Sequence, residues 1–169
     1  ASGVPGDLIE TGVWRGGATI LMRGVLKAYG ISDRTVWVAD SFEGMPKPDP
    51  SRYPMDRWLR FDLVKWARVS LEDVQANFDR YGLLDEHVRF LKGWFRDTLS
   101  TAPIDHLAVL RLDGDLYEST ILALESLYPK LSVGGYAIVD DYNIAACRQA
   151  VTDYREAHAI ADPIVDIDG

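Results

Sequence analysis

Six short apolar runs divide the chain, and each has the length of a β-strand. Several of them end abruptly in acidic residues, as expected of buried parallel strands whose carboxyl ends open into a ligand crevice. The predicted strands are Asp7–Glu10, Thr35–Ala39, Val88–Leu91, Ala108–Leu112, Ala137–Val139 and Pro163–Ile167.

Segments between these runs carry apolar residues at helical spacing. Ile20, Leu21, Val25 and Leu26 repeat along one side of the first such segment, and Gly30 follows it as a C-terminal cap. The predicted helices are Ala18–Tyr29, a short amphipathic helix over Trp58–Trp66, Ser70–Tyr81, Ser119–Leu131 and Ala145–Ala159. Alternation of strands and helices predicts an α/β fold, a mostly parallel twisted sheet with helices on both faces.

The segment Glu43–Asp56 breaks this alternation. It contains one glycine and four prolines, and prolines prevent a regular helix: Pro46, Pro48, Pro50 and Pro54. We expect an irregular lid over the active edge of the sheet.

Acidic residues follow the predicted fourth and fifth strands. If these strands are neighbours, Asp113, Asp140 and Asp141 converge at one edge, where their charges require a proton or a hard cation. The pattern therefore predicts a site for a divalent metal ion. Two alternatives stay open: Asp140 and Asp141 as N-caps of the helix that follows, and Asp115 as a helix cap or an alternative base.

Composition narrows the class of protein. With 169 residues and 47% hydrophobic residues, the chain is expected to be a single globular domain over 1–169. A net charge of −8 without an evident basic patch argues against nucleic acid or an anionic membrane as a partner. The single cysteine, Cys147, excludes an internal disulfide, and no leader or long apolar span is evident. A cytoplasmic location is the expectation.

A glycine turn follows the first strand. A dinucleotide fingerprint starting at Gly12 and ending at Gly17 would need glycine at position 14, which is Trp14, so NAD and FAD are disfavoured. A phosphate loop of the ATPase kind is missing too. Glu10 before the turn suits a small cationic ligand, although a plain tight turn fits equally well. Asp40 lies about where a ribose-binding carboxylate falls, roughly 20 residues or somewhat more after the turn.

Four separated motifs together resemble the macrocin O-methyltransferase family, of the TylF/MycF type. They occur in the expected order and cover nearly the whole chain: Asp7–Gly17, Asp40–Pro46, Leu112–Tyr117, and Gly134–Tyr136 with Val139–Tyr142. The resemblance implies a class I SAM-dependent methyltransferase (Rossmann-like) fold with five parallel strands and an antiparallel hairpin at one edge. It further implies magnesium-dependent methylation of sugar hydroxyls on macrolides and related natural products.

The resemblance also implies site residues. The methionine part of S-adenosylmethionine would be surrounded by Glu10, Thr11, Gly12, Gly16 and Gly17. Asp40 would bind the ribose, and Ser41, Gly93 and Trp94 would lie near the adenine. Asp113, Asp140 and Asp141 match the family's Mg²⁺ ligands, and Asp113 is in addition the expected catalytic base.

Two further expectations follow from the same resemblance. The partners would be a small glycosylated acceptor and further copies of the chain in a homo-oligomer. Compared with the family, the sequence starts almost at the first strand and stops at Gly169, so an N-terminal helical segment and the last edge strand would be lacking. A non-catalytic cofactor-binding or assembly fragment is therefore the alternative function.

Overall fold

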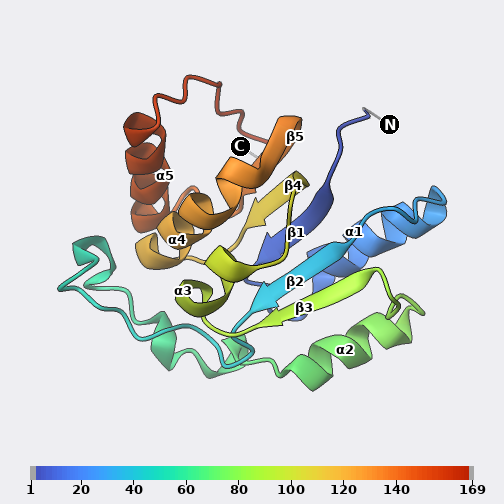
Figure 1. Cartoon of the computed structure of the whole chain (residues 1–169). Coiled ribbons are helices and arrows are strands. Elements are labelled where there is room, and N and C mark those ends of the chain that lie inside the picture. Colours follow the sequence, from blue (N-terminus) through green and yellow to red (C-terminus); the bar gives the residue numbers. More distant parts are fainter. Residues whose placement is uncertain (1–2, 168–169) are drawn as a thin grey trace.

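The computed structural model describes residues 3–167, which form one parallel sheet with flanking helices (Figure 1). The five strands lie in the order β3-β2-β1-β4-β5, and every neighbouring pair is parallel. Their bounds are β1 Asp7–Thr11, β2 Val36–Asp40, β3 Val88–Lys92, β4 Leu107–Leu112 and β5 Leu131–Val139. The predicted α/β class and parallel sheet are confirmed.

Helices cover both faces of this sheet, as predicted. They are α1 Gly17–Ala28, α2 Leu71–Arg80, α3 Phe95–Thr98, α4 Tyr117–Leu127 and α5 Ala145–Ala157. Alternate residues of β2 divide between two cores because successive side chains of a strand point to opposite faces. Val38 packs with Val74 and Phe78 of α2, whereas Trp37 and Ala39 belong to the core under α4 and α5.

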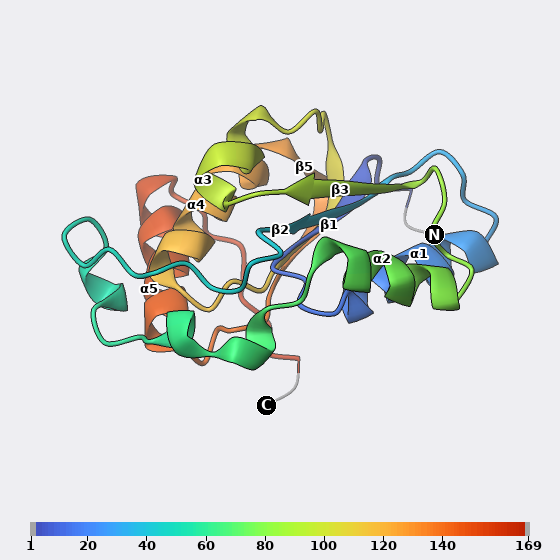
Figure 2. The ribbon, with the colours of Figure 1, turned by 90° about the horizontal axis from the view of Figure 1, so that it is seen from below.

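One face thus carries α1 and α2, and the other carries α4 and α5. Figure 2 shows α1 and α2 side by side beneath the strands. The predicted helix Ala18–Tyr29 is confirmed to within one residue at each end, and Gly30 follows it with φ of 67°. In the described residues 3–167, no helix has the length and apolar character needed to cross a membrane.

Two predicted helices need correction. Trp58–Trp66 is not an α-helix, and two 3₁₀ turns, Phe61–Leu63 and Lys65–Ala67, occupy its second half. None of its residues is buried, and Trp66 only lies edge-on to the exposed Trp14, so no core packing supports a short helix here. The fourth helix ends at Leu127 rather than Leu131, since Tyr128–Lys130 tightens to a 3₁₀ turn with Pro129.

The predicted sixth strand, Pro163–Ile167, is wrong. This segment is exposed and pairs with no strand of the described chain, and Pro163 has no backbone N–H to donate. The fifth strand begins earlier than predicted, at Leu131, and Gly134 and Gly135 lie inside it where its register against β4 shifts.

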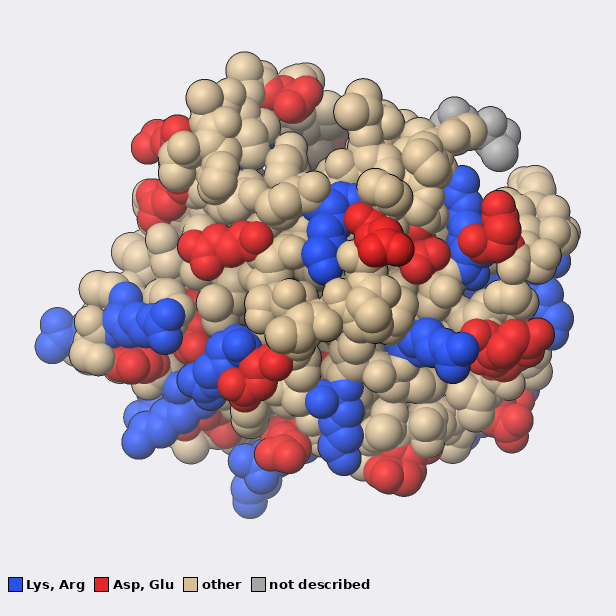
Figure 3. All heavy atoms as spheres, in the orientation of Figure 1, with Lys and Arg blue, Asp and Glu red and all other residues tan. Residues whose placement is uncertain are grey.

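The segment between β2 and α2 passes the carboxyl ends of the strands (Figure 1). The predicted lid, Glu43–Asp56, is irregular apart from one 3₁₀ turn at Pro54–Asp56. In Figure 3, acidic and basic side chains mix over the visible face, and basic ones gather at the lower left, around the lid and the segment that follows it. Because the segment passes the carboxyl ends of the strands, the lid borders any site at this edge of the sheet.

Candidate functional site

Strand register brings the acidic residues of β4 and β5 together. Leu112 pairs with Thr11 on one side and with Val139 on the other, so the residues that follow these strands emerge side by side. The backbone N–H of Asp113 donates to the Thr11 carbonyl at 2.9 Å, and that of Asp140 to the Leu112 carbonyl at 2.9 Å. One carboxylate oxygen from each of Asp113, Asp140 and Asp141 lies within 4.8 Å of the others.

These three carboxylates have the chemistry of a hard-cation site. All the donors are oxygen atoms, which Mg²⁺ prefers. Burial and the neighbouring acids raise the pKa of Asp113 to about 6, and they raise that of Asp141 to about 6 as well. Asp140 is nearly half exposed, which leaves the cluster open to solvent. The donor set therefore fits a divalent cation, with Asp113, Asp140 and Asp141 as the residues that would hold it.

The capping roles considered for these acids are wrong. The N-cap of α5 is Ile144, and no side chain caps it, so Asp140 and Asp141 do not cap this helix. Asp115 does not cap α4 either. It lies at φ 58°, and its backbone N–H donates to Asp141 at 2.9 Å. The two acids that follow β5 are thus not used as helix caps: Asp140 binds Arg111, and Asp141 accepts the backbone N–H of Asp115.

The first turn of α4 is capped from the lid instead. Asp56, which is fully buried, accepts the backbone N–H groups of Tyr117 at 2.7 Å and Glu118 at 3.0 Å. The ring of Tyr53 packs against that of Tyr117, with centroids 6.0 Å apart. The end of the lid is therefore fastened to the helix that follows the Asp113 loop. The sequence analysis did not identify this contact.

Arg111 is a further residue that the sequence analysis missed. Its guanidinium donates hydrogen bonds to Glu10, to Asp113 at 2.6 Å and to Asp140 at 2.5 Å. Burial disfavours its charge, but the Asp113 hydrogen bond and the surrounding acids outweigh burial and raise the pKa of Arg111. An arginine inside an otherwise apolar strand run was the available signal, because a buried cation requires partners.

Glu10 lies near the end of β1, directly before the glycine turn that is predicted to bind the cofactor. The residue is 2% exposed, and its carboxylate accepts the Thr19 backbone N–H at 3.2 Å in addition to the Arg111 bond. Burial raises the pKa of Glu10 to about 7, against the lowering effect of Arg111. Thr11 beside it is buried as well. Glu10 therefore joins the start of α1 to the acidic cluster.

Gly12 allows the turn to approach β4 closely. It has φ of 85°, and a Cβ atom there would lie 1.7 Å from the carbonyl oxygen of Asp113. Gly16, with φ of 83°, is the N-cap of α1, and a Cβ atom there would clash with the side chain of Val74. A Cβ atom at Gly17 would face open space. The glycine turn thus packs directly against the loop that carries Asp113.

Asp40 ends β2 with both carboxylate oxygens anchored. One accepts the Val13 backbone N–H at 2.8 Å, and the other accepts that of Phe42 at 2.7 Å. Ser41 donates to the Gly44 carbonyl at 2.8 Å, which folds the start of the lid back. The backbone N–H of Gly93 donates to the Asp40 carbonyl at 2.9 Å. These bonds fix one orientation of the Asp40 carboxylate.

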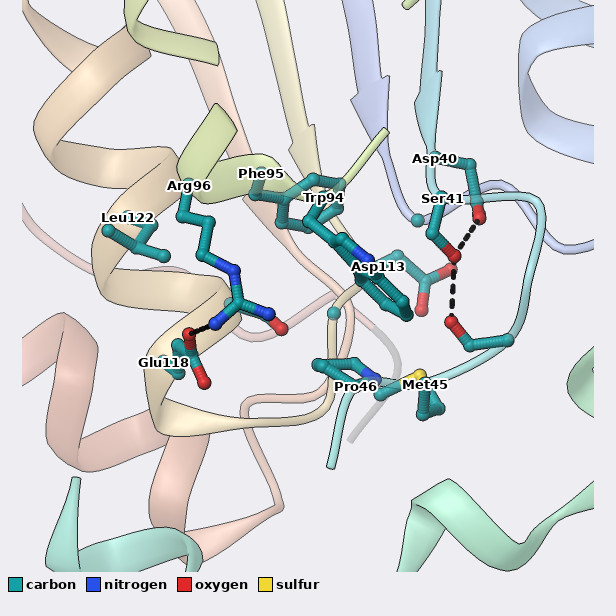
Figure 4. A pocket seen from close by; sticks show the side chains of 14 residues that line it. Asp40, Ser41, Met45, Pro46, Trp94, Phe95, Arg96, Asp113, Glu118 and Leu122 are labelled. Carbon is teal, nitrogen blue, oxygen red and sulfur yellow. Dashed lines mark hydrogen bonds and ion pairs between the residues drawn. The ribbon is translucent and has the colours of Figure 1, made fainter. Parts of the chain in front are cut away.

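A pocket lies between these strand ends, the lid and α4 (Figure 4). Of the predicted cofactor residues, Gly12, Asp40, Ser41 and Trp94 line it, whereas Glu10, Thr11, Gly16, Gly17 and Gly93 do not. Asp113 lines it too and so belongs to both the pocket and the acidic cluster. Met45 and Pro46 of the predicted lid form another part of its wall. The remaining walls include residues that were not predicted: Phe95, Arg96, Glu118 and Leu122.

One wall of the pocket carries an ion pair. Arg96 of α3 lies 3.5 Å from Glu118 of α4, as the dashed line in Figure 4 marks. Glu118 is buried, and burial raises its pKa. Trp94 and Phe95 add aromatic surface, so the pocket combines flat apolar walls with acids at its edges. Such a cavity suits a ligand with an aromatic ring and hydroxyl groups.

Comparison with known proteins gives a consistent result. The family model described as macrocin O-methyltransferase (TylF) matches residues 1–169. A protein of Streptomyces olivaceus, named 8-demethyl-8-(2,3-dimethoxy-alpha-L-rhamnosyl)-tetracenomycin-C 4'-O-methyltransferase, is 61% identical over 100% of this chain and 65% of its own length. Mycinamicin III 3''-O-methyltransferase of Micromonospora griseorubida is 59% identical over 98% of this chain and 66% of its own length.

Solved structures of methyltransferases resemble this chain as well. The O-methyltransferase NovP superposes with a TM-score of 0.93 at 59% identity, covering 98% of this chain and 69% of that one. The calicheamicin methyltransferase CalS11, at 22% identity and a TM-score of 0.76, shares the fold. The chain spans about 65% of the length of the curated relatives that it matches. On the family match and these identities, the chain belongs to the macrocin O-methyltransferase family.

Proposed function

We propose that this chain transfers a methyl group from S-adenosylmethionine to a sugar hydroxyl of a glycosylated antibiotic, with a divalent cation at Asp113, Asp140 and Asp141. One observation carries the proposal: Asp113 lines the pocket and also belongs to the acidic cluster. A methyl donor in the pocket and a hydroxyl at the cluster would therefore meet at this residue. The relatives are named as O-methyltransferases that act on antibiotics, and these names support methyl transfer to a hydroxyl oxygen as the reaction.

The pocket would bind the methyl donor. Asp40, which lines the pocket, would accept hydrogen bonds from the ribose hydroxyls. Trp94 and Ser41 would border the adenine, together with Gly93, whose backbone N–H donates to the Asp40 carbonyl. The methionine part would extend toward the glycine turn, with Glu10, Thr11, Gly12, Gly16 and Gly17 around it. The acceptor would then enter from the side of the lid.

Asp113 would act as the base. A sugar hydroxyl is a poor nucleophile at neutral pH, and a divalent cation would lower its pKa and orient it. The hydroxyl oxygen attacks the methyl carbon, the carbon–sulfur bond breaks, S-adenosylhomocysteine leaves, and the hydroxyl proton passes to Asp113. The reacting sulfonium loses its positive charge, so the residues of this site mainly hold the two reactants in line.

Methyl transfer from labelled S-adenosylmethionine tests the proposal. Acceptors would be mycinamicin III and demethyldecarbamoylnovobiocin, which the relatives are named for, and a free rhamnoside. We expect label on a sugar hydroxyl of one acceptor, and loss of at least about a hundredfold in rate for Asp113→Asn, since a general base contributes roughly that much.

The same experiment separates the alternative, a cofactor-binding or assembly fragment without turnover. A fragment of that kind would bind S-adenosylhomocysteine in calorimetry and transfer no label to any acceptor. The homo-oligomer implied by the family resemblance stays a prediction, which sedimentation velocity measures.

A further inference from the structure

Arg111 binds Glu10 and two of the three aspartates of the acidic cluster. One of its terminal nitrogens, Nη1, donates to Glu10 and to Asp113 at 2.6 Å, and the other, Nη2, donates to Asp140 at 2.5 Å. The side chain is only 17% exposed, so these carboxylates are its main partners. A single guanidinium therefore connects Glu10, which precedes the glycine turn, to two of the three proposed metal ligands.

Asp141 lies outside this arrangement. It accepts the backbone N–H of Asp115 at 2.9 Å and has no ion pair with Arg111 among the described contacts. A dication held by all three aspartates would share Asp113 and Asp140 with the guanidinium. Two cations on the same carboxylates repel each other, and this repulsion is strong in a partly buried site.

We propose that Arg111 is an internal competitor of the metal ion: it compensates the charges of Asp113 and Asp140, and a dication displaces it from them while Glu10 retains it. The inference rests on the proposed metal site. Glu10 is 2% exposed and bonded to the start of α1, which makes it a fixed partner for the displaced guanidinium. Arg111 is thus a positioning residue that sets the affinity for the cation.

The proposal predicts the sign of a binding change. Replacing Arg111 with methionine keeps a long side chain but removes the competing charge, so Mn²⁺ should bind about tenfold or more tightly. A residue that only held the acids in place would give the opposite sign, because its loss would let them move apart. The Mn²⁺ affinity of Arg111→Lys should lie between that of the unmodified chain and that of Arg111→Met, since one ammonium group cannot bridge three carboxylates.

Binding of Mn²⁺ is measured from the signal of the free ion in electron paramagnetic resonance, with circular dichroism to establish folding. Arg111→Met leaves Glu10 buried without its cation and is expected to lower stability. A second pair of proteins therefore lacks that buried charge. It consists of the Glu10→Gln variant and the double variant that carries Glu10→Gln and Arg111→Met. Tighter Mn²⁺ binding upon loss of Arg111 in either pair supports the inference.

Two results would overturn it, and they are distinguishable. Equal or weaker Mn²⁺ binding by the folded Arg111 variants, with clear binding by the unmodified chain, refutes the competition and leaves the metal site intact. Lack of Mn²⁺ binding by the unmodified chain and by every Arg111 variant refutes the metal site of the proposed function together with this inference.

Discussion

Asp40 is the last residue of β2 and Asp113 the first residue after β4, yet their surroundings differ. Two backbone N–H groups hold the Asp40 carboxylate, and neutral hydroxyls can approach its remaining lone pairs. Asp113 instead lies beside Arg111 and the other acids, in a site where further negative charge is unfavourable. The same residue type can therefore serve a ribose at one strand end and a cation at the other.

The first prediction concerns Asp40. In Asp40→Asn the side-chain amide cannot accept both backbone N–H groups and both ribose hydroxyls, so S-adenosylhomocysteine should bind more weakly by about 1.5–3 kcal/mol. Isothermal titration calorimetry measures this change as roughly a ten- to hundredfold increase in Kd.

Asp7→Asn is the matched control for that variant. Asp7 also accepts a backbone N–H, that of Thr35, but at the opposite end of the sheet from the pocket. Its substitution is expected to leave cofactor affinity within about twofold of the unmodified value, whatever its effect on stability. Unchanged affinity in Asp40→Asn would remove Asp40 from the cofactor site.

Sequence reasoning located the acids but not their partners. Strand ends are visible in the apolar pattern, and parallel pairing places Asp113, Asp140 and Asp141 at one edge whatever the loops do. Arg111 and Asp56 bind residues 101 and 61 positions away in the chain, and local periodicity carries no information about such contacts. The lid was predicted from its prolines, and its Met45 and Pro46 do line the pocket, whereas the walls contributed by α3 and α4, including Phe95, Arg96, Glu118 and Leu122, were not predicted.

At the scale of elements, the lid and α4 form one unit. Asp56 accepts the first N–H groups of α4, and Tyr53 packs on the same turn, so the lid is anchored at its far end while Ser41 and Gly44 fold its near end. The stretch between these anchors includes Met45 and Pro46, which border the pocket. Closure over an acceptor is expected to involve this middle stretch.

The second prediction tests the anchor. Asp56→Ala removes the acceptor for two backbone N–H groups of α4 and should lower the free energy of unfolding by about 1–2 kcal/mol, as for other helix caps. Hydrogen exchange monitored by mass spectrometry should become faster in peptides covering both the lid and the first turn of α4. Asp56→Asn keeps one acceptor oxygen and should give an intermediate effect. Faster exchange in neither segment would show that Asp56 does not fasten the lid.

Short elements were also where the predicted fold failed. Trp58–Trp66 is too short for a stable isolated helix and has no buried face to compensate. Pro163–Ile167 has no neighbouring strand with which to pair among residues 3–167. The longer α1 and the strands β1 to β4 were predictable because local pattern and tertiary packing agree there.

At the scale of the whole molecule, an ion pair ties α1 to the loop before β3. Arg23, with a side chain 6% exposed, donates three hydrogen bonds to Asp85, the shortest at 2.7 Å. The Arg23 hydrogen bonds lower the pKa of Asp85. This contact lies far from the strand ends that form the site, so it reports on stability alone.

The third prediction follows from that shift. Because the folded pKa of Asp85 is below its ordinary value of 3.8, its contribution to stability is complete above that value and is lost as the pH falls through the folded pKa. Asp85→Asn should therefore cost about 1–3 kcal/mol near pH 6. The difference from the unmodified chain should shrink toward pH 3. Urea denaturation of both proteins at each pH measures it, and a difference independent of pH would exclude the ionic contribution.

The central claim, that the acids at the ends of β4 and β5 bind a cation needed for methyl transfer, is tested most directly by labelled methyl transfer in chelator with magnesium added back. We predict that chelator abolishes transfer and that magnesium restores it. Asp140→Asn should require a higher magnesium concentration for half the maximal rate, because one ligand charge is lost. Full activity in strong chelator, or an Asp140→Asn variant with unaltered rate and magnesium requirement, would contradict the metal mechanism.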